Sequence, residues 1–179
     1  MRYGDNNYLI TNYGLRMDKK LQIIFAYLKE LFPHPETELN YSTPFQLVVA
    51  VMLSAQATDI QVNKVTDKLF KKIKDPEDLL AMGFANFERS ISSINYYRTK
   101  AKHIWETAKL LPLITSPQPS PKIGEDEKHQ LIYKIPEDLE ELMKFPGIGV
   151  KTAKLVLHEL YGQAFIAVDT HIHRVSNRL

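Results

Sequence analysis

The stretch Phe145-Pro-Gly-Ile-Gly-Val-Lys-Thr-Ala153 decides the fold. Helical patterns flank it over residues 136–144 and 150–161. Gly147 and Gly149 allow the backbone to turn sharply between these two helices. The N–H groups of the turn and of the following helix N-terminus have no partner within the helix, so they favour an anion such as a phosphate diester. An ordinary structural corner between two helices is the alternative interpretation.

Outward from this hairpin, the pattern is helical almost throughout. Apolar residues recur every three to four positions, and Ser, Thr, Asp or Pro stands where most of these segments begin. We expect helices over 18–32, 44–55, 60–73, from 75, over 86–94, 98–111, 136–144 and 150–161, and from 169. The segment 45–55 is apolar almost all round, so its helix should be central and buried. Strand signals are weak, and we predict an all-α fold.

Two segments depart from the helical pattern. Residues 1–16 are polar and lack the apolar run of a signal peptide, so we expect a poorly ordered extension before a helical domain over 17–179. Residues 115–128 are rich in Pro, Ser and charge and show no period. This second segment predicts an exposed loop within the domain.

Composition excludes several classes of site. The 179 residues contain no cysteine, which rules out a disulfide, a cysteine nucleophile and any thiolate metal site built from this chain. The formal net charge of +2 permits nucleic-acid binding without requiring it. No run of residues is apolar for long enough to span a bilayer.

Lys151 is the candidate nucleophile. It lies in the first turn of the helix after the hairpin, where the helix dipole disfavours its ammonium form. Lys154, three residues further on, repels the same charge. A neutral amine is the form that attacks a sugar aldehyde carbon. The alternative is that Lys151, Lys154 and His158 form the solvated stripe of an amphipathic helix.

Other polar residues stand at the ends of apolar segments. Asp169 is a suitable N-cap for the last helix, and capping does not prevent a catalytic role. His171 and His173 are two apart on that helix and face different ways, so we expect no paired metal ligation. Gln56 follows the buried helix. It either ends that helix or presents an amide that replaces lost base-pairing hydrogen bonds.

Together these segments resemble the endonuclease III family. The resemblance covers about residues 18–179, and several motifs in one order are more specific than any one alone. The matching stretches are 35–40, 53–59 with 62–64, 145–152 with 154–157, and 166–171 with 174–175 and 177–178.

The resemblance implies a helix-hairpin-helix DNA glycosylase fold, with a six-helix barrel lobe, an incomplete second helical lobe and a DNA groove between them. The helix-hairpin-helix at 139–160 would bind the backbone of the damaged strand. A flipped, oxidised pyrimidine would be removed when Lys151 attacks C1′ and forms a Schiff base, and β-elimination would then nick the strand. Asp169 would assist by electrostatics or by proton transfer.

The resemblance also implies a set of DNA contacts. Gln56 would fill the gap left by the flipped base, and the loop of Ile94, Asn95 and Tyr96 would press on the opposite strand. The remaining contacts would come from Gly147, Gly149, Val150, Thr152 and His171. Family members usually carry Gly at position 95 and often Leu at position 96, so we expect Asn95 to adopt a positive φ and Tyr96 to stack.

Family members usually continue into a segment with four cysteines around a [4Fe-4S] cluster. This sequence ends before such a segment, so we expect a truncated or short form with no metal and no cofactor from this chain. The expected partner is double-stranded DNA with an oxidised pyrimidine or an abasic site, bound by a cytoplasmic, nucleoid-associated monomer that does not contact a membrane.

Two alternatives remain. One is the adenine-removing mismatch branch of the superfamily. It is disfavoured because its glutamate would fall at Ala50 and because it usually lacks a lysine at position 151. The other is an inactive remnant that binds DNA without cutting it.

Overall fold

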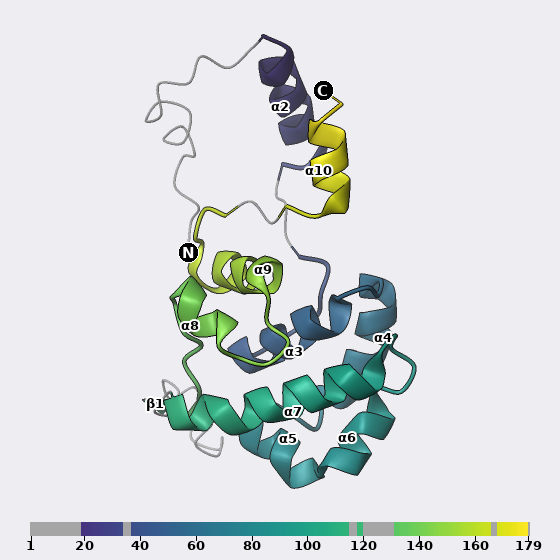
Figure 1. Ribbon diagram of the computed structural model, residues 1–179, viewed down its shortest axis with the longest axis vertical. Helices are drawn as coiled ribbons and strands as arrows, with labels where there is room; N and C mark the ends of the chain where they lie inside the picture. Colours follow the sequence, from purple (N-terminus) through teal and green to yellow (C-terminus); the bar gives the residue numbers. More distant parts are fainter. Residues whose placement is uncertain (1–18, 34–36, 115–117, 120–130, 166–167, 179) are drawn as a thin grey trace. The chain divides into compact units, whose positions relative to one another are not determined.

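The computed structural model describes residues 19–33, 37–114, 118–119, 131–165 and 168–178 (Figure 1). The chain divides into two compact units, Met1–Thr37 and Glu38–Leu179. The expected extension over 1–16 and most of the expected loop over 115–128 lie outside the described residues.

The described part of the first unit is the helix α2 (Lys19–Leu31). This confirms the helix expected over 18–32. None of its residues is buried. Its large apolar side chains are exposed instead, among them Ile23, Phe25 and Tyr27.

The second unit is built around the helix α3. Its helices are α3 (Pro44–Ser54), α4 (Asp59–Leu69), α5 (Pro76–Met82), α6 (Phe84–Ser90), α7 (Tyr97–Ile114), α8 (Leu139–Met143), α9 (Val150–Tyr161) and α10 (Thr170–Ser176). Every residue of α3 from Phe45 to Leu53 is buried, as its apolar sequence predicts. The helices α4, α7 and α9 pack against it.

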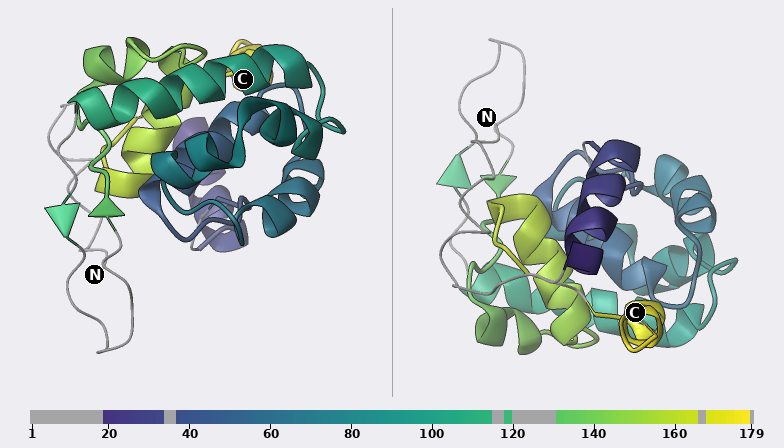
Figure 2. Two further views of the ribbon diagram at one scale, coloured as in Figure 1. Left: turned by 90° about the horizontal axis from the view of Figure 1, so that it is seen from below. Right: turned by 90° about the horizontal axis from the view of Figure 1, so that it is seen from above.

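A second layer lies beyond α7. The helices α5 and α6 pack against α7, which runs between them and α3 (Figure 1). Figure 2 shows from both ends that the strands β1 (Gln118–Pro119) and β2 (Leu131–Ile132) lie away from α4. They pair antiparallel over two residues each. The all-α class is confirmed, and among the described residues this short pair is the one element that the sequence did not predict.

Side-chain caps fix where the helices begin. Thr43, Thr58, Asp75, Asp138 and Asp169 each accept a hydrogen bond from a backbone N–H two or three residues further on. Such a cap supplies a partner to a donor that the helix itself leaves unpaired. At the start of α3 this cap is Thr43 and not the neighbouring Ser42.

Some helix bounds differ from those expected. The helix expected over 86–94 is α6, which begins two residues earlier and ends at Ser90. Gly83, with a φ of 83°, is both the C-cap of α5 and the N-cap of α6. Residues 91–96 instead form consecutive turns, in which the N–H of Ile94 donates to Ile91 O at 2.9 Å. Within the described residues, no helix is long and apolar enough to cross a membrane.

Candidate functional site

The hairpin between α8 and α9 is held by buried side chains on both sides of its turn. Phe145 and Ile148 are buried, and the N–H of Ile148 donates to Phe145 O at 3.1 Å. Gly147 has a φ of 78°. A Cβ atom at this position would lie 2.6 Å from Nδ1 of His103 on α7. Only glycine therefore fits the turn, for reasons of both backbone conformation and space.

Gly149 has a different role from the one that the sequence suggested. Its φ of −93° is extended backbone that any residue adopts. A Cβ atom there would meet nothing within 4 Å. Gly149 is the N-cap of α9 and offers no side chain to the first N–H groups of that helix. The open space and the uncapped donors together suit an anion.

Lys151 and Asp169 come together beside this helix start. Nζ of Lys151 lies 3.2 Å from Oδ2 of Asp169, and the two side chains are 56% and 31% exposed. The other carboxylate oxygen, Oδ1, accepts from the N–H of His171 at 2.9 Å and from that of Ile172 at 2.8 Å. Asp169 therefore caps α10 with one oxygen and pairs with Lys151 through the other.

The surroundings of Asp169 keep it ionised. The N–H of Ile172 and then the ammonium of Lys151 lower the pKa of the Asp169 carboxyl. Hydrogen bonds to a carboxylate favour its charged form. At neutral pH, Asp169 is thus an acceptor and a fixed negative charge, and it has no proton to donate.

Lys151 has a partner that the sequence did not reveal. The helix dipole and Lys154 oppose a positive charge at this position, whereas the carboxylate of Asp169, 3.2 Å from Nζ, attracts one. Nζ of Lys154 instead lies over the ring of Phe165, 5.7 Å from its centroid. A nucleophilic Lys151 must therefore lose a proton while it leaves this ion pair.

A second exposed group joins the end of α3 to the turn before α7. Gln56 and Tyr96 have φ values of 57° and 56°, and both side chains are exposed. Nδ2 of Asn95 donates to the carbonyl of Gln56 at 3.1 Å, so the two turns are held to each other. The positive φ was expected at Asn95 and is found at Tyr96.

Ile94 does not belong with the exposed residues of this turn. Its side chain is 2% exposed and packs in the hydrophobic core. The expected DNA contact therefore does not fit the Ile94 side chain. This side chain instead anchors the turn to the core. Asn95 and Tyr96 are the residues that the turn presents to solvent, and Tyr96 is 70% exposed.

Sequence reasoning missed Lys100, which is 9% exposed. Its Nζ donates to Leu53 O at 2.7 Å and to Ala55 O at 2.5 Å. Burial lowers the pKa of Lys100. The sequence carried a signal for it, because Lys100 precedes Ile104 by one helical turn and so stands on the buried face of α7. It holds the last carbonyls of α3 just before Gln56.

The other expected contact residues lie around the hairpin and the start of α10. Val150 and His171 are exposed, and Thr152 is half-buried. Nδ1 of His171 lies 3.3 Å from Nη2 of Arg174. Across the described residues, no three His, Asp or Glu side chains are grouped to hold a metal ion. A [4Fe-4S] cluster does not fit this chain's own residues either, because the sequence offers no thiolate.

Comparison with known proteins identifies the family of this chain. Residues 49–179 match the model of the HhH-GPD superfamily of base excision DNA repair proteins. Endonuclease III of Bacillus subtilis (strain 168) is 44% identical over 161 residues, which are 90% of this chain and 66% of that relative. Endonuclease III of Escherichia coli (strain K12) is 42% identical, over 89% of this chain and 68% of that protein. The chain thus spans about two thirds of the length of these curated relatives.

The fold of this chain is also similar to that of a solved structure. It is a trapped covalent intermediate of an endonuclease III with DNA, in an estranged-adenine complex. The TM-score is 0.73 and the sequence identity is 39%, over 91% of this chain and 70% of that one.

Proposed function

This chain belongs to the HhH-GPD superfamily of base excision DNA repair proteins and to its endonuclease III family, and we propose that Lys151 is the nucleophile of a DNA glycosylase with abasic-site lyase activity. The family expected from the sequence is confirmed, and with it the enzyme class at the level of the family. The activity of this chain, its substrate and the roles of individual residues are proposals.

The observation that carries the proposal is the ion pair of Lys151 and Asp169 at the start of α9. Nζ lies 3.2 Å from Oδ2, and the Lys151 side chain is 56% exposed. A sugar bound beside the hairpin can therefore reach the amine. The carboxylate next to it can stabilise the positive charge that develops on the sugar as the base departs.

The proposed reaction follows from these two groups. The neutral amine of Lys151 attacks C1′, the C1′–N bond breaks, and the base leaves with the bonding electrons and takes up a proton. Ring opening gives a protonated Schiff base between Nζ and C1′. Loss of a C2′ proton then breaks the C3′–O bond, and the 3′ phosphate leaves. Because Asp169 is ionised, its part is electrostatic at the first step.

The hairpin and the paired turns would hold the DNA. The uncapped N–H groups at Gly149 and Val150 suit a phosphate of the damaged strand. Gln56 and Tyr96 would occupy the space that the flipped nucleotide leaves, since both are exposed and their turns are tied by Asn95. The base that we propose is an oxidised pyrimidine. The protein would act as a monomer on DNA in the cytoplasm.

The mismatch branch gains no support from α3. Ala50, where an acidic residue of that branch would fall, is fully buried and carries no ionisable group. A lyase is therefore the activity that the side chains favour.

Trapping tests the proposal. The protein would be incubated with duplex DNA that carries an abasic site, in the presence of sodium borohydride, which reduces a Schiff base to a stable amine. We expect a covalent adduct with the native chain and with Lys144→Gln, and none with Lys151→Gln. Lys144 is an exposed lysine of the same hairpin, which makes it the matched control. An adduct of undiminished yield with Lys151→Gln would overturn the proposal.

A further inference from the structure

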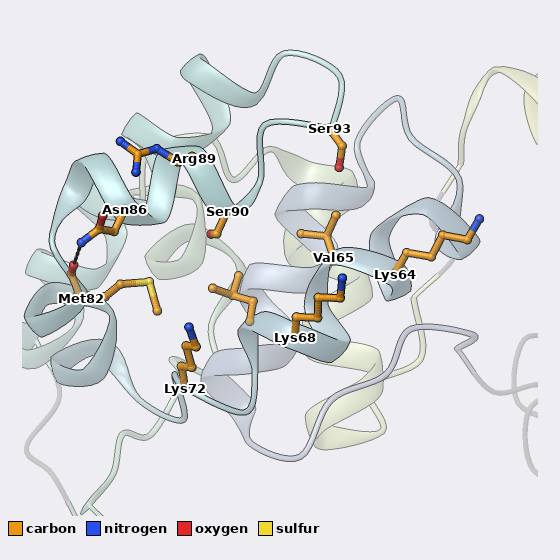
Figure 3. Close-up of a pocket in the computed structure, with 10 residues that line it drawn as sticks. Lys64, Val65, Lys68, Lys72, Met82, Asn86, Arg89, Ser90 and Ser93 are labelled. Carbon is orange, nitrogen blue, oxygen red and sulfur yellow. Dashed lines mark hydrogen bonds between the residues drawn. The ribbon is translucent and has the colours of Figure 1, made fainter.

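We propose that a basic groove between α4 and α6 binds the phosphate backbone of the DNA strand opposite the lesion, a contact that rests on the proposed function and extends it. The groove has a volume of about 600 Å³. Its cations are Lys64, Lys68, Lys72 and Arg89 (Figure 3). It is separate from the hairpin and from the pair of Lys151 and Asp169.

The charge of the basic groove is not neutralised from within. No carboxylate is among the ten described residues that line it. In the part of the chain that the structure describes, none of its four cations takes part in an ion pair. Lys64 and Lys68 are four residues apart on α4 and repel one another. A bound polyanion relieves that repulsion and releases its own counterions, which favours binding.

The arrangement of the side chains fits an extended anion. In Figure 3, Lys72 points into the space between the helices, Lys68 lies along α4, and Arg89 lies on the opposite edge. Leu69 lies at the base of the groove and is 3% exposed. The amide of Asn86 is engaged, because its Nδ2 donates to Met82 O at 3.0 Å. The cations are therefore the charged groups that can meet a ligand.

The basic groove is joined to the turn that carries Tyr96. Ser93 lines the groove, and its carbonyl accepts from Nε2 of Gln61 on α4 at 2.6 Å. Three residues later Tyr96 projects into solvent. A DNA strand that passes Tyr96 would therefore next contact the side of the basic groove at Ser93.

The topology indicates which strand this is. The helix α9, which begins at the hairpin, packs against α3, and α4 packs against α3 as well. Figures 1 and 2 show α9 and α4 on different sides of α3. If the hairpin holds the damaged strand, the backbone beside α4 belongs to its complement. Phosphate contacts of this kind position a duplex and carry no sequence information.

The test compares two double variants with equal loss of charge. Lys68→Gln/Lys72→Gln removes two cations that line the groove, and Lys71→Gln/Lys74→Gln removes two exposed neighbours that do not line it. Binding to a long duplex with a stable abasic-site analogue is measured against salt concentration. Each lost phosphate contact should reduce the slope of log Kobs against log salt by roughly 0.9. We expect a reduction of about 1 to 2 for the groove variant and a smaller one for the control.

A second arm identifies the strand and the source of the phosphate. Neutral methylphosphonate linkages are placed singly along each strand. Those in the opposite strand beyond the lesion should weaken binding by the native chain and leave the groove variant unaffected. Equal slopes for both double variants, or an effect confined to the damaged strand, would overturn the proposal. So would competition by a free nucleoside triphosphate, which would identify a mononucleotide site.

Borohydride trapping on a duplex that ends just past the lesion separates the two proposals. The groove variant should form its adduct there as the native chain does, since the groove is not reached. A failure of every protein to form an adduct would count against the lyase. The salt slopes would still decide on the groove, because they measure binding alone. Thermal unfolding confirms that both double variants are folded.

Discussion

Lys151 and Asp169 form an ion pair across 18 residues of sequence, with 3.2 Å between Nζ and Oδ2. The lysine stands in the first turn of α9, and the aspartate is the N-cap of α10. Two helix N-termini therefore meet at one pair of charges. The Asp169 carboxylate lies near the positive end of both helix dipoles. In the proposed reaction it is therefore also close to the sugar that Lys151 would bind.

Replacing Asp169 by Asn should separate its two roles. Asn is also a good N-cap, so α10 should keep its start, whereas the charge beside Lys151 is lost. We expect adduct formation on an abasic duplex to slow by about 10²- to 10³-fold, as when one preorganised electrostatic group is removed. Single-turnover rates measure the effect, and far-UV circular dichroism checks the helices. A rate within twofold of the native chain would show that the carboxylate is dispensable.

Acid should remove the contribution of Asp169 to stability only at low pH. Its folded pKa is lowered, mainly by the N–H of Ile172 and then by Lys151. Such a group stabilises the fold fully above its unfolded pKa, which is about 3.9 for Asp, and the contribution is lost as pH falls through the lower folded value. The stability difference between the native chain and Asp169→Asn should be constant above about pH 5 and shrink below about pH 4. Urea unfolding at stepped pH measures it, and a difference that shrinks between pH 6 and 8 would contradict the assignment.

The two hairpin glycines should respond differently to alanine. Gly147→Ala forces a φ of 78° on a residue with a Cβ and brings that atom to 2.6 Å from His103. We expect a loss of at least about 1–2 kcal/mol in the free energy of unfolding. Gly149→Ala meets no neighbour, so it should cost only the roughly 0.5–1 kcal/mol by which Ala is a poorer N-cap than Gly. Its DNA affinity should fall instead, because the new methyl group enters the space assigned to a phosphate. Unfolding and binding titrations of both variants test this, and the reverse order of stabilities would refute it.

Lys100→Met should weaken the fold and loosen the turn at Gln56. The variant keeps the bulk of the side chain but leaves the carbonyls of Leu53 and Ala55 without the ammonium. Loss of hydrogen bonds to a charged donor costs about 1.5–3 kcal/mol. Denaturant unfolding measures that loss. Because Gln56 follows these carbonyls directly, excision should also become less sensitive to the base opposite the lesion. If the folded Lys100→Met protein keeps the native preference for the opposite base, the role of Lys100 is only structural.

The sequence was most informative where a local rule decides the structure. Capping residues such as Thr58 and Asp75 mark their helix starts, and the apolar run of α3 marks the centre of the core. Contacts between residues that are far apart in the sequence could not be predicted from such local rules. Asp169 was assigned as a cap, but its contact with Lys151 joins two helices that are 18 residues apart in the sequence, and no local pattern indicates it.

The turn at 91–96 shows the same limit. Asn95 was expected to take the left-handed conformation, because that backbone favours Asn over Tyr. Its side chain instead binds the Gln56 carbonyl, and Tyr96 takes the positive φ. Lys100 was overlooked because a lysine within a helix is usually solvated. Its two carbonyl partners lie 45 and 47 residues away in the sequence.

Peptide mapping of the trapped adduct tests the central claim most directly. The native chain would be reduced with borohydride on an abasic duplex, digested with nuclease and protease, and the residue that carries the sugar remnant located by tandem mass spectrometry. We predict the remnant on Nζ of Lys151, in the peptide that follows the Gly147–Gly149 turn. A remnant on Lys154, Lys100 or any other amine, with Lys151 unmodified, would contradict it.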